Sequence, residues 1–526
     1  MSAQPDGTAL ASALHDPGCY PHAAERVDEI ETHISRVFLT GEFAYKLKKP
    51  VKLPFLDFTS LAARRRFCDE ELRLNRRLAP ELYLAVMPVT GTDAAPRVGG
   101  NGPVLDYVVQ MRQFDQSALL DRALKRHAVT APLVASLARD VERFHANAIA
   151  RKSPAQDTQR VLAAALENFG EFQALLVDGE TRAALDDLRR WTLDTFKTRT
   201  AAFEARDVRG FIRECHGDLH LGNIVLWEGR AIAFDCIEFN AQLRWIDVID
   251  EVAFAAMDFT AHGRDDLACV FLNAYLEASG DYAGARCLPF YLVYRAMVRA
   301  KVNAIRASQS AITAAERSRD LAACRRYIEV ARMRSRQQSG ALIITHGYAG
   351  SGKSTLAREL VAELGAICIR SDVERKRLHG LDALAASASP AQGGIYAAAQ
   401  TRKTYAVLLD SARHLVEAGF TAIVDATFLQ AAQRAEFAEL ADGLGVPFAI
   451  LDLDIPDDVM RERIVARARK GGDASEATLT VLDTQLAHAE PLSEDERAMT
   501  VTAVAGSTAR SIADALARHA GMRAPD

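Results

Sequence analysis

The stretch 341–364, ALIITHGYAGSGKSTLARELVAEL, contains the feature that most limits how this chain can fold. An apolar run predicts a strand over 341–345, a glycine-rich loop follows it, and a helical pattern occupies 353–364. The loop fits the spacing G-x-x-x-x-G-K-S at 347–354, in which consecutive backbone N–H groups and a helix N-terminus attract phosphate. The stretch therefore predicts an α/β domain with a doubly wound sheet and a phosphate-binding loop.

The residues of this loop predict a site for ATP and Mg²⁺. We expect Lys353 to contact the β- and γ-phosphates and Ser354 to bind the metal ion. The other residues expected to contact the nucleotide are Gly347, Gly350, Ser351, Gly352 and Thr355.

Polar residues follow the next strands of this region. Asp372 comes just after the apolar run 366–370, where it could orient an acceptor hydroxyl, and Arg375 could bind an anionic group of the acceptor. Asp425 lies in the strand-like run 419–428 and is expected to hold Mg²⁺ through water. Three arginines near a Gly-Gly pair look like a lid that closes on the transferred phosphate, although they could be ordinary surface charges: Arg463, Arg467 and Arg469.

Together, these motifs resemble small P-loop kinases, especially the polynucleotide kinase and gluconate kinase group, and also zeta toxins. The resemblance covers residues 340–526, which we expect to form a P-loop kinase, or AAA-type ATP-binding, domain. It implies an ATP-dependent transfer of phosphate but does not identify the acceptor.

A second stretch, 216–235, HGDLHLGNIVLWEGRAIAFD, places an Asp, an Asn and an Asp in the order used by protein kinases. Asp218 could steer the proton of an attacking hydroxyl, while Asn223 and Asp235 could share Mg²⁺ across the phosphates. Gly217 stands where the kinase pattern has Arg. The alternative is a polar turn between two strands.

At these residues the chain resembles the aminoglycoside phosphotransferase and choline kinase superfamily, whose HGDxxxxN loop Asp218 and Asn223 match. Trp245 and Asp247, followed by an apolar helix, also match that pattern. We expect Asp247 and Asp250 to brace the catalytic loop, and a substrate role for Glu238 or Asp250 stays open. The resemblance implies a bilobal, protein-kinase-like fold that binds ATP and Mg²⁺.

The segment before this stretch predicts the small lobe of such a fold. Two β-rich runs flank a turn at 40–42, and Lys46 lies in the second run. Ser60 can cap a helix whose apolar stripe contains Glu71, and a carboxylate on a buried stripe needs a cation. We therefore predict a Lys46–Glu71 pair that holds the α- and β-phosphates, with Glu71 as a simple rim residue as the alternative.

Three further expectations concern the same half of the chain. Thr32 and Ser35 are candidates for touching phosphate, because no glycine-rich loop precedes Lys46. Residues 104–114 resemble the last small-lobe strand and the hinge. His145 is expected to be a satisfied core histidine and not a ligand.

The length and the amino-acid composition fit a soluble protein of several domains. The chain has 526 residues, of which 49% are hydrophobic and 25% are charged, and a formal net charge of −5 argues against a globally basic nucleic-acid binder. Eight cysteines without a CxxC pair favour reduced thiols, and the N-terminus does not read as a signal peptide, so we expect a cytoplasmic protein.

The predicted organisation is a loose lead-in over 1–24, a kinase-like domain over 25–335 and the P-loop domain over 340–526. The kinase-like domain divides into a small lobe of about 25–112 and a helical large lobe of about 113–335. The whole resembles bacterial fusions of these two halves. The fold class is thus α+β for the first half and α/β for the second.

The leading functional hypothesis is a double kinase with ATP bound in both domains and hydroxyl acceptors of unknown identity. One alternative is a 5′-hydroxyl kinase of nucleic acid ends, in which the basic segment 291–339 holds the strand. That segment has eleven Lys or Arg against three acidic residues, and three of its arginines fall close to one helix face: Arg295, Arg299 and Arg306. The segment could equally be a solvated helical connector. A second alternative is a regulator in which one half controls the other.

Overall fold

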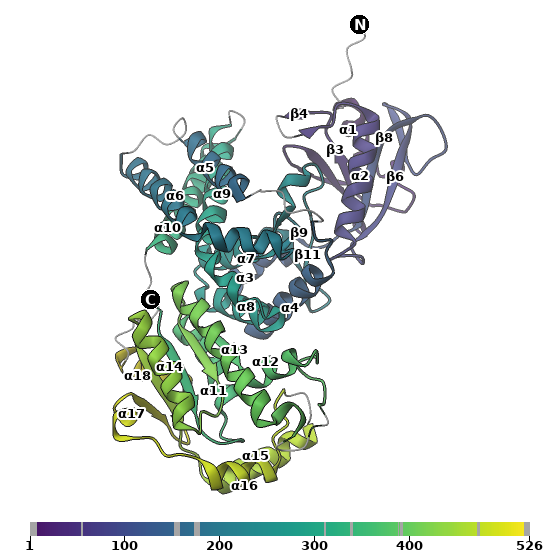
Figure 1. Ribbon diagram of the computed structural model, residues 1–526. Helices are drawn as coiled ribbons and strands as arrows, with labels where there is room; N and C mark the ends of the chain where they lie inside the picture. The colour runs from purple at the N-terminus through teal and green to yellow at the C-terminus, as the bar shows by residue number, and fades with distance from the viewer. Residues whose placement is uncertain are drawn as a thin grey trace. The chain divides into compact units, whose positions relative to one another are not determined.

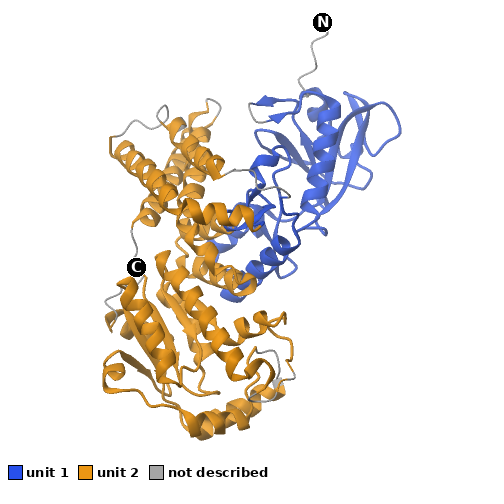
Figure 2. Ribbon diagram, viewed as in Figure 1, with its two compact units in different colours: residues 1–154, 210–251 blue, residues 155–209, 252–526 orange. Residues whose placement is uncertain are grey.

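The computed structural model describes residues 8–53, 56–151, 158–172, 179–309, 312–336, 340–387, 389, 393–470 and 474–519. The chain forms two compact units, drawn in different colours in Figure 2: unit 1 is 1–154 and 210–251, and unit 2 is 155–209 and 252–526. The helices of 252–335 therefore cluster with the P-loop region, whereas the sequence motifs group them with the first half. The domain boundaries at 335 and 340 stay a prediction.

Unit 1 is built on an antiparallel sheet with the strand order β1-β2-β3-β8-β6-β7 (Figure 1). The predicted hairpin is present: Val37 of β2 pairs with Lys46 of β3, and Gly41 in the turn has φ +99°. The strands are β1 (Asp28–Glu31), β2 (Ser35–Leu39), β3 (Phe43–Lys48), β6 (Tyr83–Thr92), β7 (Ala95–Val98) and β8 (Val104–Arg112).

The expectation of a loose lead-in over 1–24 is wrong for residues 8–20. Helix α1 (Thr8–Ala13) buries Leu10, and Tyr20 packs in the same apolar cluster with Phe38 and Tyr45 of the sheet. Burial of these side chains fixes a segment whose small and polar residues gave no strong helical pattern. Residues 1–7 lie outside the described ranges.

The opposite face of the sheet is covered by helix α2 (Leu61–Asn75), which packs on β8 and β6 (Figure 1). Its predicted cap is correct, because Ser60 Oγ accepts a hydrogen bond from the N–H of Ala63 at 3.1 Å. The other elements of unit 1 are α3 (Leu120–Lys125), α4 (Ala131–Asn147), β4 (Lys52–Leu53), β5 (Leu56–Asp57), β9 (Ile212–Glu214), β10 (Ile224–Trp227), β11 (Arg230–Ala233) and β12 (Trp245–Asp247).

Unit 2 begins with helices. They are α5 (Thr158–Phe172), α6 (Gly179–Val208), α8 (Asp265–Ser279), α9 (Leu288–Ser308) and α10 (Ala314–Ser335), together with most of α7 (Val248–Ala261). The helical prediction for 291–339 is therefore confirmed at α9 and α10, and residues 310–311 and 337–339 lie outside the described residues. Among the helices of the described ranges, none combines the length and the apolar character needed to span a bilayer.

The remainder of unit 2 is a parallel sheet with the strand order β14-β15-β13-β16-β17. Helices α11 and α18 cover one face and helices α13 and α14 the other, which is the predicted doubly wound arrangement. The strands are β13 (Leu342–His346), β14 (Ile367–Arg370), β15 (Ala422–Asp425), β16 (Phe448–Leu453) and β17 (Thr500–Ala503). The helices are α11 (Lys353–Leu364), α12 (Ser371–Leu378), α13 (Ala398–Glu417), α14 (Ala431–Leu444), α15 (Asp457–Lys470), α16 (Leu479–His488), α17 (Glu494–Ala498) and α18 (Ala509–His519).

Candidate functional sites

The predicted Lys46–Glu71 pair is present in unit 1. Glu71 lies on α2 with its side chain fully buried, and Lys46 Nζ of β3 is 2.8 Å from its Oε1. Lys46 Nζ also lies 2.5 Å from Oδ1 of Asp235, whose side chain is 41% exposed. Burial alone would lower the pKa of Lys46, but the carboxylates of Asp235 and Glu71 raise it well above its ordinary value. The ammonium group therefore stays charged at the place where phosphates would bind.

A second lysine, Lys48, lies behind the first and was missed by the sequence reasoning. Its Nζ is 2.6 Å from Oε2 of Glu71 and also pairs with Glu238, and all three side chains are nearly inaccessible to solvent. Burial by itself would raise the pKa of Glu71, but Lys46 and Lys48 lower it to about 2. The signal was available, because residues two apart on a strand share one face. The substrate role left open for Glu238 is replaced by this buried pairing.

The loop with Asp218 has the geometry expected of a catalytic loop. Asn223 Nδ2 donates to Asp218 Oδ2 at 2.9 Å and to the Asp218 carbonyl at 3.1 Å. The amide nitrogen is thus committed to Asp218, which leaves the amide oxygen of Asn223 as the atom that could bind a metal ion. The side chain of Asp218 is 34% exposed, so its carboxylate is accessible to solvent.

Hairpin β10–β11 brings Asp235 close to Asn223 in the loop. The N–H of Phe234 donates to the carbonyl of Asn223 at 2.9 Å, so Asp235 follows directly on the residue that pairs with Asn223. Asp235 has φ +64°, a left-handed conformation that is uncommon for a residue with a side chain. An amide oxygen and a carboxylate are donors that Mg²⁺ accepts, so the residues present fit the ion.

Gly217, the departure from the kinase pattern, has a structural cause. Its φ is +91°, and a Cβ at this position would lie 2.7 Å from the carbonyl oxygen of Leu243. The backbone approach of Leu243 therefore excludes an arginine here.

Glu251, at the start of α7, braces the catalytic loop and was not predicted. Its carboxylate accepts the N–H groups of His216 at 3.1 Å and Gly217 at 2.6 Å. His145 Nε2 lies 2.7 Å from Glu251 Oε2, which confirms that His145 has a partner in the core. His145, Cys215 and Glu251 place ligand atoms within 4.8 Å of one another, but the backbone contacts of Glu251 favour a structural role. Asp247 accepts the N–H of Ile249 in α7 at 2.9 Å, and the expected bracing of the loop by Asp247 and Asp250 stays a prediction.

Thr32 and Ser35 lie at the turn between β1 and β2. Their hydroxyl oxygens are 2.8 Å apart, and Ser35 is buried. Phosphate contact by these hydroxyls stays a prediction.

The glycine-rich loop of unit 2 has the backbone that its sequence requires. Gly347, Gly350 and Gly352 all have positive φ, of +140°, +82° and +99°. A Cβ on Gly350 would lie 2.6 Å from the carbonyl oxygen of Met460, so a side chain cannot be accommodated there. The loop leads into α11, which begins at Lys353 as predicted, and Ser351 is buried while Thr355 is exposed.

Lys353 is held over this loop. Its Nζ donates to the Tyr348 carbonyl at 2.6 Å and lies 3.4 Å from Ser351 Oγ. Burial lowers the pKa of Lys353 to about 8. The side chain is therefore curled against the loop that would surround the phosphates.

Asp425 ends β15 in a buried position beside the loop. Burial raises its pKa, while a hydrogen bond from Ser354 and the charges of Arg370 and Lys353 act in the opposite direction. A hydroxyl and a carboxylate in contact are oxygen donors suited to Mg²⁺, so this site also fits the ion.

The predicted acceptor residues lie on α12. Asp372 is partly exposed in its first turn. Arg375 is buried: its Nη1 donates to the Ile395 carbonyl at 3.0 Å and to Thr401 Oγ1 at 3.2 Å, and its guanidinium stacks on Tyr396. These contacts hold Arg375 in place, so a direct contact with an anionic acceptor needs them to rearrange.

Of the lid arginines on α15, one touches the phosphate loop. Arg463 Nη1 donates to the Ser351 carbonyl at 2.9 Å, whereas Arg467 Nη2 donates to the Ala477 carbonyl at 3.1 Å. Arg469 is exposed. The Gly-Gly pair at 471–472 lies outside the described residues.

Of the three arginines expected on one face of the basic connector, two lie against aromatic rings and the third, Arg306, is exposed. The guanidinium of Arg295 lies 4.7 Å from the ring centre of Phe254, and that of Arg299 lies 5.5 Å from that of Tyr327. Arg306 is 3.7 Å from Asp320. This arrangement favours the connector interpretation over a phosphate-binding patch.

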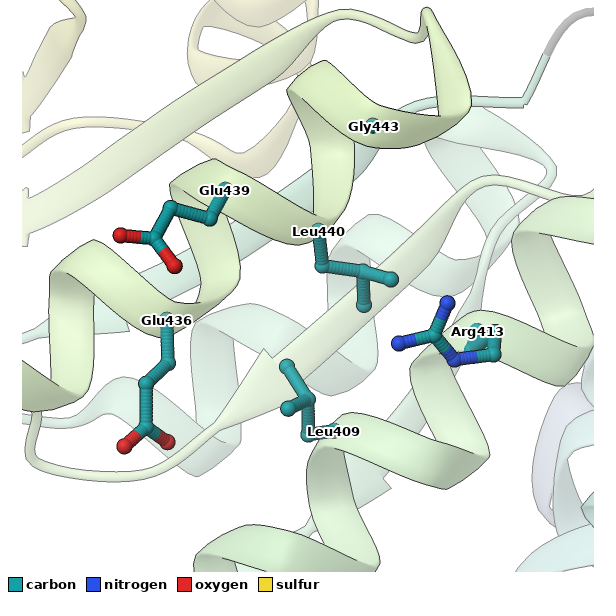
Figure 3. A pocket seen from close by; sticks show the side chains of 6 residues that line it. All are labelled: Leu409, Arg413, Glu436, Glu439, Leu440 and Gly443. Atoms are coloured by element: carbon teal, nitrogen blue, oxygen red, sulfur yellow. The ribbon is translucent and has the colours of Figure 1, made fainter.

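A pocket of about 300 Å³ lies between α13 and α14, and it contains none of the predicted site residues. Figure 3 shows that Arg413 comes from one helix and that the carboxylates of Glu436 and Glu439 extend from the other, away from its guanidinium. These groups do not converge on a common point, so the pocket does not form a third candidate site.

One family model and several known proteins are similar to this chain. Residues 342–492 match the family described as AAA domain. The uncharacterized protein Rv2004c of Mycobacterium tuberculosis and the uncharacterized protein Mb2027c of Mycobacterium bovis are each 33% identical to this chain over 473 residues. That alignment covers 89% of this chain and 92% of each relative.

Solved structures similar to parts of the chain include kinases of both expected kinds. A choline/ethanolamine kinase family protein from Mesorhizobium loti is 12% identical and covers 62% of this chain and 98% of its own, with a TM-score of 0.36. Amicoumacin kinase hAmiN is 14% identical over 63% of this chain and 94% of its own, with a TM-score of 0.38. A gluconokinase from Sinorhizobium meliloti is 20% identical over 35% of this chain and 96% of its own, with a TM-score of 0.25. These scores are too low for any property of those proteins to be transferred to this chain.

Proposed function

The chain belongs to one family with the mycobacterial proteins Rv2004c and Mb2027c, and from its two sites we propose that it is a bifunctional ATP-dependent phosphotransferase. Each half would bind Mg²⁺ and ATP and transfer the γ-phosphate to a hydroxyl acceptor. The observation that supports the proposal is that one chain holds two different groups of residues suited to binding phosphate. One is a buried Lys46–Glu71 pair beside Asp235, and the other is the loop around Lys353 beside Asp425.

Each residue of the first site has a separate role in the proposed reaction. Lys46, steadied by Glu71, would bind the α- and β-phosphates, while Asn223 and Asp235 would hold Mg²⁺. Bound Mg²⁺ would neutralise charge on the phosphates. Asp218 would orient the acceptor hydroxyl and take up its proton. A small-molecule acceptor is proposed for this half.

In the second site, Lys353 would bind the β- and γ-phosphates, and Ser354 with Asp425 would hold the metal ion. Asp372, partly exposed at the start of α12, would orient the acceptor. A 5′-hydroxyl oligonucleotide has less support as the acceptor, because Arg295 and Arg299 of the connector lie on aromatic rings.

The proposal is tested by counting nucleotide sites in the full-length protein. Calorimetric titration with a non-hydrolysable ATP analogue and Mg²⁺ should give two sites in the parent protein and one in each of Lys46→Ala and Lys353→Ala. Asp218→Asn should retain both sites but lose phosphate transfer by the first half when metabolites are screened as acceptors. A single site in the parent, or two sites that persist in Lys353→Ala, would show that the assignment is wrong.

A further inference from the structure

Helix α8 belongs to the first half by sequence, yet within unit 2 it is attached to the P-loop region. It packs on α11 and β14, and Asn273 Oδ1 accepts the N–H of Cys368 in β14 at 2.7 Å. Arg377 of α12 donates to the carbonyl of Ala278 at 2.9 Å and also to that of Glu277, both in the last turn of α8. A cation at a helix C-terminus is favourable, so these contacts fix the end of α8 beside α12.

This attachment places Glu277 next to Arg370, the last residue of β14. Arg370 Nη1 is 3.7 Å from Glu277 Oε1, and Arg370 Nε is 3.7 Å from Asp425 Oδ2. The exposed fraction of the three side chains is 10% for Arg370, 28% for Glu277 and 5% for Asp425. One guanidinium thus lies between a carboxylate of α8 and the carboxylate that would hold Mg²⁺.

The equal distances have a physical consequence. An arginine is always charged, and a guanidinium can pair with one carboxylate through two parallel hydrogen bonds. If Arg370 paired fully with Asp425, it would compete with the metal ion for that carboxylate. Glu277 supplies a second anion for the same guanidinium, near Nη1, whereas Asp425 lies near Nε.

From these two equal distances we propose that Glu277 is a positioning residue for the second nucleotide site: it draws Arg370 away from Asp425, so that a helix of the first half sets the Mg²⁺ requirement of the P-loop half. This inference rests on the proposed function of the P-loop as a Mg²⁺–ATP site. It identifies a residue that lies outside residues 340–526 and outside every motif of the sequence analysis.

The test measures nucleotide binding as a function of Mg²⁺ in the full-length protein. The parent is Asp235→Asn, which removes the carboxylate of the first metal site, and the probe is a fluorescent ATP analogue. Glu277→Gln should raise the Mg²⁺ concentration for half-maximal binding roughly tenfold, within the range of coupling between neighbouring charges. Glu277→Asp should restore most of the loss, since it keeps the charge.

A matched control exists in the same interface. Glu417 of α13 is 3.6 Å from Arg286 and 30% exposed, but this pair does not involve Asp425. Glu417→Gln should therefore leave the Mg²⁺ requirement unchanged. Once Arg370 is replaced by Gln, adding Glu277→Gln should have no further effect.

The outcomes separate the two levels of the argument. If Lys353→Ala abolishes the signal while Glu277→Gln leaves the Mg²⁺ requirement unchanged, the role of Glu277 is refuted and the nucleotide site stands. An equal shift from Glu277→Gln with and without Arg370 also refutes that role. A signal that persists in Lys353→Ala refutes both the site and the inference.

Discussion

Replacing Lys48 with methionine should destabilise unit 1 far more than any other single change at the first site. Lys48 holds Glu71 and Glu238 together where the exposed fractions of the three side chains are 1%, 0% and 4%. Solvent cannot compensate at such burial, and removing one partner of a buried ion pair costs about 3–5 kcal/mol. Lys46 still pairs with Glu71, so we expect the lower end of that range, about 3 kcal/mol, mostly from the stranded Glu238.

The cost should depend on pH in a known direction. Burial already raises the pKa of Glu238, and loss of Lys48 should raise it further. A group with a raised folded-state pKa contributes stability at low pH that is lost as pH rises through that pKa. The deficit of Lys48→Met should therefore shrink as the pH falls from 8 to 5.5.

The assay is urea unfolding followed by tryptophan fluorescence, since Trp227 and Trp245 both lie in unit 1. The double variant Lys48→Met with Glu238→Gln removes the stranded charge and should recover more than half of the loss. Lys46→Met is the comparison: Glu71 would still pair with Lys48, and Asp235 is 41% exposed, so this change should cost less than Lys48→Met while abolishing ATP binding by the first half. If Lys48→Met unfolds at the parent's urea concentration, or if Glu238→Gln restores nothing, the buried cluster does not stabilise the fold in this way.

Three further outcomes are expected. Gly350→Ala should lose nucleotide binding at the second site by at least about tenfold, because its Cβ would lie 2.6 Å from the Met460 carbonyl at φ +82°; binding at the first site, measured in the same calorimetric titration, should not change. The pKa values of Glu71 and Glu251 are lowered to about 2, so the stability that these carboxylates give unit 1 should be present above their ordinary pKa of about 4.5 and be lost as the pH falls towards 2. Circular dichroism can follow this loss, and a stability that is independent of pH over this window would contradict it. Chelation of Mg²⁺ with EDTA should abolish phosphate transfer by both halves, and activity that survives chelation would exclude the assigned oxygen ligands from that role.

Local rules predicted the parts of both sites that depend on neighbouring residues. Glu71 was identified because a carboxylate on an apolar helical stripe needs a cation, and Lys46 is that cation. The phosphate loop followed from its glycines and from the strand and helix on either side, which are present at β13 and α11.

The parts that were missed depend on contacts distant in sequence. Glu251 braces a loop that begins 35 residues before it, and it sits in an apolar helix without any motif of its own. Asn273 finds its partner, Cys368, 95 residues further on, and no periodic pattern carries that information. Residues 8–20 acquire their order from the sheet they cover, since their own sequence has little helical preference.

The side-chain amide of Asn273 has a practical consequence for anyone who wishes to express the C-terminal half by itself. β14 stands at the end of its sheet, and a fragment that starts at residue 340 would leave the N–H of Cys368 without this partner. Exposed edge strands pair with strands of other chains, so such a fragment should precipitate or self-associate. A cut before residue 265 would keep α8 with the strand that it shields.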